Sequence, residues 1–428
     1  MSRTARTLVV LCACGLALPA CKEEAAAPAV EPAPAKKVEA PKADPAQALL
    51  DAAIAARGGL DKLKAAASWT GKSKGRYMGM PYESKNAYRP GAWYMDISMP
   101  NGDRTVMAMG ADVCWTQHGA VVVPCPPEAK KNSAIVAEMD KAMTLWPLKE
   151  GGWKLTAGKA DCGGKQCDTL QVEHAASGAA GTLTFDEKKM LTRAVYKAAM
   201  MGQPGEFVST MSGTQEACGV KFPAKISVTF NGMPYVDEET SEIACGPADE
   251  KLFAQPEQVK DGTFLKKQIV PAVVACLTHK GPYDKIGEQM GKLMGQLKEH
   301  KLAPMGPPMM FYLKSPPKVK KPDKFVTSLC FPVATKPPDK PEQKGEIHVK
   351  AMPAMSVLAV YGLGPYDKKG EELMKALMAE AKKRKLKPAG PVCQISHMDP
   401  DKYKPEELVS EMLLPIKAKK GKKKKKKG

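Results

Sequence analysis

Polar and apolar residues alternate in short runs through the first half of the chain, as in AWYMDISM and TLQVEH. Alternation with a period of two is typical of strands that bury one face. Glycine, proline, asparagine or aspartate separates the runs, and these residues favour turns. The pattern predicts about nine antiparallel strands before residue 250.

A helical pattern precedes these strands. In PAQALLDAAIAARGG, Leu50, Ala53 and Ile54 lie on one face of a helix that ends before Gly58. One helix followed by many antiparallel strands predicts an α+β fold in which a strongly curved sheet wraps over the helix. We assign residues 47–256 to this first domain.

The second half of the chain repeats itself, because GPYDK occurs at 281–285 and again at 364–368. Self-alignment gives a repeat of roughly 83 residues, with copies at about 268–333 and 351–416. Each copy predicts a strand, a helix with one apolar stripe and two further strands. We expect the copies to pack about a pseudo-twofold axis in a domain at 263–416, with a groove between them.

The last strands of the two copies differ at one position, where LVSEMLLPI carries Glu411 and FVTSLCFPV carries Ser328. A carboxylate inside an apolar strand must be paired, protonated or face a cavity. Glu411 is therefore the candidate receptor for a ligand cation. The alternative is an edge strand on which Glu411 faces water. The candidate aromatic residues of the groove are Phe311, Tyr312, Tyr361, Tyr283 and Tyr366, of which the last two can instead be structural parts of the GPYDK joint.

Twelve cysteines are present, and six of them fall into pairs before residue 250. We predict three disulfides, because cysteine pairs of this kind are typical of an oxidising compartment. A zinc site is the alternative, but no C-x-x-C pair occurs and no two histidines have ligand spacing, so we predict no metal site. We expect buried thiols at Cys276, Cys330 and Cys393, with one bridged pair as the alternative. The predicted disulfide residues are Cys114 with Cys125, Cys162 with Cys167, and Cys218 with Cys245.

Both ends of the chain predict contact with a membrane. Arg3 and Arg6 precede an apolar run at 8–18 that is too short to span a bilayer, the layout of an export signal. Residues 21–46 are rich in alanine and proline and predict a disordered tether. Nine lysines in a disordered tail at 417–428 contribute to the net charge of +19. In an exported protein this tail meets anionic lipid or polymer rather than nucleic acid, and a solvated tail without a dedicated partner is the alternative.

The sequence LPAC resembles the lipobox of bacterial lipoproteins. The resemblance implies a signal peptide at 1–20, a lipid on Cys21 and attachment to a membrane of the cell envelope. Lys22, in place of aspartate after the cysteine, implies the outer membrane. The alternative is an ordinary cleaved signal with a chance cysteine.

The first domain resembles the LolA-like and LolB-like outer-membrane lipoprotein carriers. The matching segments are ARGGLDKLKAAASWTGKSKG, AWYMDI, GADVCW, TLTFDEKKMLTRAV and KLFAQP. The resemblance implies a half-barrel with an apolar hollow for an acyl chain or another lipophilic ligand.

The duplicated domain resembles the GyrI-like small-molecule binding proteins and the AraC-type effector-binding domains. The matching segments are both GPYDK joints, KLAPMGPPMMFYL with KLKPAGPVCQISH, and VSEMLLPI. In that family an acidic residue on the last strand binds cationic, aromatic or amphipathic compounds. The resemblance places this role on Glu411.

These patterns together predict a lipid-anchored cell-envelope protein that binds a small lipophilic or cationic molecule without catalysis. One alternative is a hydrolase of a reactive small molecule, with Glu411 and a groove tyrosine as base and acid. The other is an envelope scaffold that binds anionic polymer. Haem would need an axial ligand, and His279 beside the first joint is the one candidate. Nothing else in the sequence supports haem, so we predict no cofactor.

Overall fold

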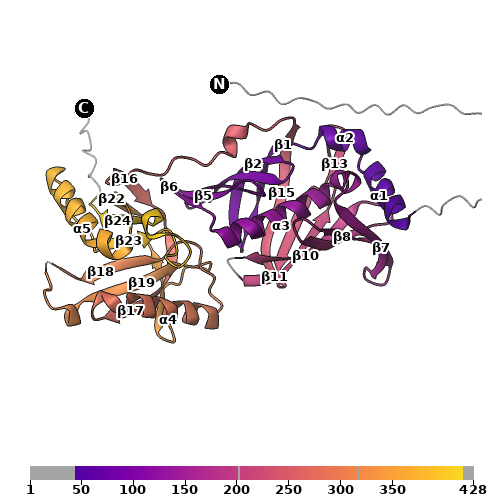
Figure 1. The fold of residues 1–428 in the computed structure, drawn as a ribbon. Helices are drawn as coiled ribbons and strands as arrows, with labels where there is room; N and C mark the ends of the chain where they lie inside the picture. Colours follow the sequence, from indigo (N-terminus) through magenta and orange to yellow (C-terminus); the bar gives the residue numbers. More distant parts are fainter. Residues whose placement is uncertain (1–43, 201–202, 317, 418–428) are drawn as a thin grey trace, which may run out of the picture. The chain divides into compact units, whose positions relative to one another are not determined.

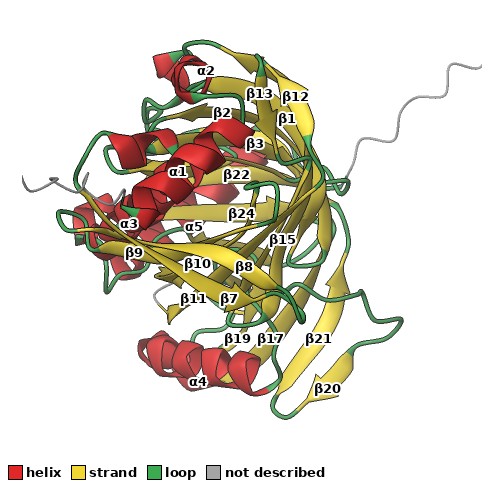
Figure 2. Ribbon diagram, turned by 90° about the vertical axis from the view of Figure 1, so that its right-hand side faces the viewer, coloured by secondary structure: helices red, strands yellow, loops and turns green. Residues whose placement is uncertain are grey.

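The structure, a computed structural model, describes residues 44–200, 203–316 and 318–417. The predicted signal peptide, Cys21, most of the tether and the tail from residue 418 lie outside the described residues. The described chain is a mixture of α and β structure in which antiparallel sheets dominate and helices are few (Figure 2). Among the described helices, none combines the length and apolar character that crossing a bilayer requires.

The chain enters the fold through two short helices, α1 (Pro45–Ala56) and α2 (Leu60–Ala65). Helix α1 begins at Pro45, where the side chain of Asp44 caps it, so residues 45 and 46 are helical and do not belong to the tether as predicted. The predicted stripe of Leu50, Ala53 and Ile54 is buried.

The first sheet has thirteen antiparallel strands, in the order β6-β5-β4-β3-β2-β1-β15-β14-β11-β10-β9-β8-β7. The prediction of about nine strands was wrong. Three of the runs that were each predicted as one strand form hairpins of two strands, and the strand Gln203–Ser212 was not predicted. In one such hairpin, Met78 and Gly79 both have positive φ, a two-residue turn that links two strands without interrupting the polar and apolar alternation. The strands are β1 (Trp69–Tyr77), β2 (Met80–Arg89), β3 (Ala92–Ser98), β4 (Arg104–Gly110), β5 (Cys114–His118), β6 (Val121–Pro124), β7 (Trp153–Asp161), β8 (Gln166–His174), β9 (Ala179–Phe185), β10 (Leu191–Met200), β11 (Gln203–Ser212), β14 (Lys225–Phe230) and β15 (Met233–Cys245), beside a separate pair β12 (Gln215–Ala217) and β13 (Val220–Phe222).

A helix that the sequence analysis did not predict, α3 (Pro127–Thr144), lies between β6 and β7 in the chain. It buries Met139 and Ala142 in the same apolar core as Leu50 of α1. The side chain of Asn132 exchanges two hydrogen bonds with the backbone of Ala199, which fixes α3 against β10. The main core of the first sheet therefore lies under two helices.

The second sheet has nine antiparallel strands, in the order β16-β22-β24-β23-β18-β19-β17-β21-β20. The order strand, helix, strand, strand occurs twice, first as β17, α4, β18, β19 and then as β22, α5, β23, β24. Helix α4 lies along β17 and β19, and α5 along β22 and β24 (Figure 1). The elements are β16 (Phe264–Ile269), β17 (Ala272–Lys280), α4 (Ile286–Glu299), β18 (Met309–Lys314), β19 (Val326–Pro332), β20 (Glu342–Lys344), β21 (Ile347–Met352), β22 (Met355–Leu363), α5 (Tyr366–Lys383), β23 (Val392–Ser396) and β24 (Val409–Pro415).

The first residue of both GPYDK joints is a glycine with a positive φ angle. Gly281 has φ 130° and Gly364 has φ 118°, which residues with a side chain rarely adopt. Each glycine turns the chain from an apolar strand toward the helix that covers it.

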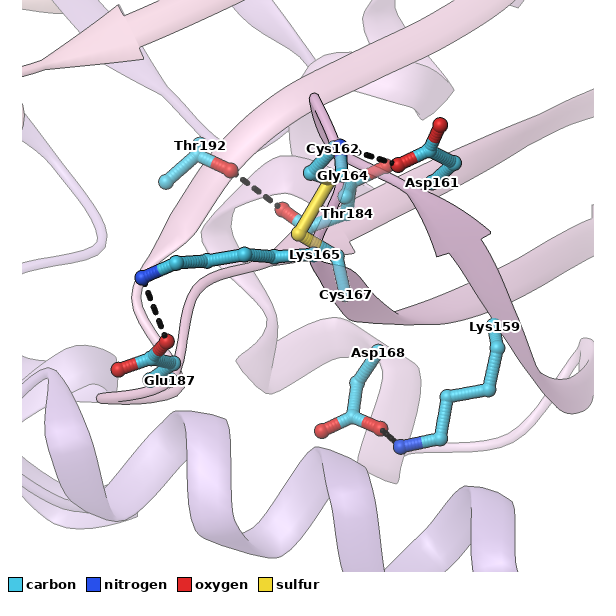
Figure 3. The surroundings of a disulfide bond; sticks show 10 residues. All are labelled: Lys159, Asp161, Cys162, Gly164, Lys165, Cys167, Asp168, Thr184, Glu187 and Thr192. Carbon is cyan, nitrogen blue, oxygen red and sulfur yellow. Dashed lines mark hydrogen bonds and ion pairs between the residues drawn. A yellow bond between two sulfur atoms is a disulfide. The ribbon is translucent and has the colours of Figure 1, made fainter.

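The three predicted disulfides are confirmed, and a fourth joins Cys276 to Cys330, directly opposite each other on β17 and β19. Cys393 is a buried free thiol. Figure 3 shows the Cys162–Cys167 bridge across the turn between β7 and β8, where the Asp161 carboxylate accepts a 2.7 Å hydrogen bond from the N–H of Gly164.

Candidate functional site

Glu411 lies in the interior of the second sheet. Its strand β24 pairs with β22 on one side and β23 on the other, and the side chain is 1% exposed. The alternative of an edge strand on which Glu411 faces water is therefore wrong. A buried carboxylate needs compensating charge or hydrogen bonds, because burial alone disfavours its ionised form.

Two side chains compensate the charge of Glu411. Lys267 of β16 forms an ion pair with Oε1. His397, which follows β23, donates a 3.1 Å hydrogen bond from Nε2 to Oε2. Although burial opposes ionisation, the hydrogen bond from His397 and the charge of Lys267 lower the pKa of Glu411 to about 2. Glu411 is therefore a carboxylate at neutral pH.

An aromatic ring stands beside this carboxylate. Tyr361 of β22 is the direct cross-strand partner of Glu411 and is fully buried. Burial and the charge of Glu411 raise the pKa of Tyr361, so its hydroxyl stays protonated. The ammonium of Lys267 lies 5.8 Å from the centroid of the Tyr361 ring, within the range of a cation–π contact.

Three buried polar atoms around Glu411 have no hydrogen-bond partner of good geometry. Among the described residues, the Tyr361 hydroxyl and His397 Nδ1 are buried without a hydrogen-bond partner, and Glu411 Oε1 has an ion-pair partner but no hydrogen bond of good geometry. Buried polar atoms in proteins are nearly always hydrogen-bonded, so a group of exceptions is unusual. The arrangement leaves hydrogen-bonding capacity that a further group can use.

The six predicted ligand-binding residues do not form one group. Phe311, Tyr361 and Glu411 share one face of the second sheet. Tyr312 points to the opposite face, under α5, because adjacent residues of a strand alternate between faces. Its hydroxyl donates a 2.6 Å hydrogen bond to Gln394. Tyr283 packs against Tyr312 and stacks on Phe325. The expectation that one groove contains all these aromatic residues is therefore wrong.

Tyr366 has a structural contact at the second joint. Its hydroxyl donates a 2.5 Å hydrogen bond to the carbonyl of Met398 and accepts a 3.0 Å hydrogen bond from the N–H of the same residue. Tyr366 thus fixes the start of α5 to the segment after β23, next to His397.

Neither Lys267 nor His397 was predicted as a partner of Glu411. Lys267 belongs to FLKKQI, a short strand that was not predicted. His397 ends the predicted run VCQISH but carried no signal of its contact. The Lys267 contact depends on pairing of β16 with β22, whereas His397 lies only 14 residues before Glu411 and reaches it through the pairing of β23 with β24.

The first sheet carries a separate pocket of about 610 Å³, lined by residues of β1, β2, β14 and β15 among others. Tyr82 donates a 2.5 Å hydrogen bond to Glu238 there, and burial raises the pKa of Glu238. The lining is strongly charged, so this pocket differs from the apolar hollow that the LolA-like resemblance implies. Its ionisable residues besides Tyr82 are Lys74, Arg76, Glu83, Lys225, Asp237, Glu238 and Glu239.

Apolar residues are partly exposed elsewhere on that sheet. Trp93 and Met95 of β3 stand opposite Met109 and Met107 of β4, and none of the four is fully buried. Trp115, by contrast, is buried and donates a hydrogen bond to the carbonyl of Phe253. Trp146 and Trp153 pack against the core under the helices.

The chain is similar to several solved structures and, over one segment, to a family model. No curated protein matches the chain. Similar solved structures include the C-terminal domain of EcmrR, at 15% identity over 36% of this chain and 98% of that one, with a TM-score of 0.33. A LolA superfamily protein from Nitrosomonas europaea is 10% identical over 49% and 97% of the two chains, with a TM-score of 0.35. A DUF1329 family protein from Desulfovibrio piger is 14% identical over the same shares, with a TM-score of 0.34.

A family model matches one segment of the chain. The segment is residues 252–334, which contain β16 to β19, and Glu411 lies outside it. Residues 252–334 therefore match the GyrI-like small molecule binding domain.

Proposed function

We propose that this chain binds a small lipophilic cation beside Glu411 and Tyr361, and that it does so as a lipid-anchored protein of the cell envelope. The observation that carries the binding proposal is the fully buried carboxylate with a tyrosine directly opposite and unsatisfied polar atoms around it. The match of residues 252–334 to a small-molecule binding domain supports it.

The chemistry of the site favours a cation with apolar groups. Glu411 supplies a fixed negative charge at neutral pH. The Tyr361 ring supplies a face that attracts cations, and Phe311 and Ile395 supply apolar surface on the same side of the sheet. Desolvation makes such contacts stronger than they are in water.

The hydrolase alternative is less consistent with these groups. A general base works best when its pKa is near the working pH. The pKa of Glu411, about 2, makes it a weak base at neutral pH, and the raised pKa of Tyr361 makes that hydroxyl a weak acid. These directions favour binding over proton transfer.

We extend the proposal to the first sheet. The partly exposed Trp93, Met95, Met107 and Met109 offer adaptable apolar contact of the kind that lipophilic ligands use. We propose that the thirteen strands form a half-barrel around such a ligand, and that the two strand-helix-strand-strand units of the second sheet are copies related by a pseudo-twofold axis.

The anchoring part of the proposal rests on the sequence LPAC, with the outer membrane as the expected site. Four disulfides support an oxidising compartment. Metabolic labelling with a radioactive fatty acid tests the anchor in a bacterial host. The full chain is expected to take up label and Cys21→Ser to take up none, whereas equal labelling would remove Cys21 from the proposal.

A thermal-shift comparison tests the binding proposal. Tetraphenylphosphonium carries one delocalised positive charge in an apolar shell, and tetraphenylborate has the same shape with negative charge. We expect tetraphenylphosphonium to stabilise the full chain more than tetraphenylborate does, and Glu411→Gln to abolish that difference. Equal shifts with both ions, or an unchanged difference in Glu411→Gln, would contradict the proposal.

A further inference from the structure

The ammonium of Lys267 occupies the place in which Glu411 and Tyr361 would receive a ligand's charge. It forms an ion pair with Glu411 Oε1 and lies 5.8 Å from the centroid of the Tyr361 ring. These are the two contacts that a bound organic cation would make with the same pair of side chains. The chain thus supplies its own cation to this site.

The two partners of this ion pair differ in exposure. Glu411 is 1% exposed on an interior strand, whereas the Lys267 side chain is 28% exposed. Lys267 belongs to β16, which is the edge strand of the second sheet and pairs with β22 alone. A lysine side chain on a flexible four-carbon stem can place its ammonium in solvent when the site is taken by another cation. Glu411 has no comparable route to water.

We propose that Lys267 is a tethered competitor, which fills the cation site of the free protein and must be displaced by any cationic ligand. This inference rests on the proposed function. Competition of this kind lowers apparent affinity by the fraction of molecules in which the site is open. It also sets specificity, because a compound must offer apolar contacts beyond its charge to displace an ammonium that is already bound.

The second half of the sheet contains a matched lysine without a carboxylate. Lys350 of β21 stands 83 residues after Lys267 and pairs with Val274 of β17, as Lys267 pairs with Val357 of β22. Both lysines are half-buried. At the position equivalent to Glu411, however, β19 carries Ser328.

Lys350 therefore supplies a control of the same type in an equivalent strand position. Removing its charge leaves the Lys267 and Glu411 pair untouched. Losing one lysine changes the net charge and the packing at a half-buried strand position. If such a general effect altered the affinity for a cation, it would appear equally in Lys267→Met and Lys350→Met.

The opposing account is that the ion pair serves only to neutralise Glu411 inside the fold. On that account Lys267→Met leaves an unpaired buried carboxylate and weakens the protein without opening a site. The two accounts differ in ligand affinity, because only a competitor increases affinity for cations when it is removed.

Isothermal titration of the full chain with tetraphenylphosphonium distinguishes them. We expect Lys267→Met to bind about tenfold or more tightly than wild type, Lys350→Met to match wild type, and Lys267→Met with Glu411→Gln to lose the gain. Lys267→Arg keeps the competing charge and is expected to stay as weak as wild type. If Lys267→Met folds poorly, tighter binding by Lys267→Arg would still contradict the competitor role.

Each outcome has a defined meaning. The competitor role is overturned if folded Lys267→Met binds tetraphenylphosphonium no more tightly than wild type, or if Lys267→Arg binds it more tightly. In either case the proposed function stands as long as wild type binds the cation. If neither wild type nor Lys267→Met binds tetraphenylphosphonium, the proposed function fails and the inference fails with it.

Discussion

His397 Nε2 donates a 3.1 Å hydrogen bond to Glu411 Oε2, and the two side chains are 5% and 1% exposed. Because the carboxylate accepts this bond, Nε2 carries the proton, and Nδ1 is left without a partner among the described residues. The pair anchors the ionised form of Glu411 inside the sheet and gives a pH dependence that can be measured.

We expect Glu411 to contribute stability that is lost in acid. Its folded pKa, about 2, lies below the ordinary value of 4.5, so the contribution is fully present above pH 4.5 and falls as the pH decreases toward 2. Urea unfolding of wild type and Glu411→Gln at pH 6 and at pH 3 measures it. The gap in unfolding free energy between the two proteins should shrink at pH 3, because the unfolded carboxyl takes up a proton there and the folded one does not. A constant gap would show that Glu411 has the same pKa in the folded and the unfolded protein.

A double-mutant cycle should detect coupling between Lys267 and Glu411. Lys267→Met leaves a buried carboxylate with His397 as its remaining partner, and we expect a cost of about 1–3 kcal/mol. Glu411→Gln in the same chain removes the unpaired charge and should recover part of that cost. Additive effects in chemical denaturation would mean that the two side chains do not interact in solution.

The disulfides should differ in their contribution to stability. Cys276–Cys330 closes a separation of 54 residues and Cys162–Cys167 one of 5. Chain-entropy arguments give about 4 kcal/mol for the longer loop and about 2 kcal/mol for the shorter one. Replacing each pair with alanine and measuring urea unfolding tests the order, and a larger loss at Cys162–Cys167 would contradict it.

Alanine at the first joint should be destabilising. Gly281 has φ 130°, and a methyl group on its Cα would meet only the His279 ring, at 3.5 Å, which is an ordinary contact. Backbone strain is therefore the main cost of Gly281→Ala, about 1 kcal/mol. Gly291→Ala is the matched control, because Gly291 lies inside α4 with open space around it and alanine favours helices. Thermal melts should move in opposite directions, and a stabilised Gly281→Ala would exclude strain at the joint.

The sequence predicted features that depend on neighbours along the chain. Cys114 with Cys125 and Cys162 with Cys167 lie close in sequence, and the apolar residues on both sides of Glu411 indicated its burial. The contact between Lys267 and Glu411 was not predictable in this way. It requires β16 to pair with β22, which brings Lys267 opposite Val357 although 90 residues separate them.

Two errors have identifiable physical causes. Helix α3 was missed because half of its apolar residues are alanines and because they are spread among lysine, glutamate and aspartate, so the helical stripe is weak. Phe311 and Tyr312 were assigned to one groove, although neighbouring residues of a strand point to opposite faces.

The most direct test of the binding site is to locate a bound cation. Tetraphenylarsonium has the shape and charge of tetraphenylphosphonium, and its arsenic atom scatters anomalously. In crystals of the full chain grown with tetraphenylarsonium, we predict an anomalous peak within about 6 Å of the Tyr361 ring and beside the Glu411 carboxylate, with the Lys267 ammonium displaced. Anomalous peaks only elsewhere on the protein, with Lys267 still paired to Glu411, would contradict the account.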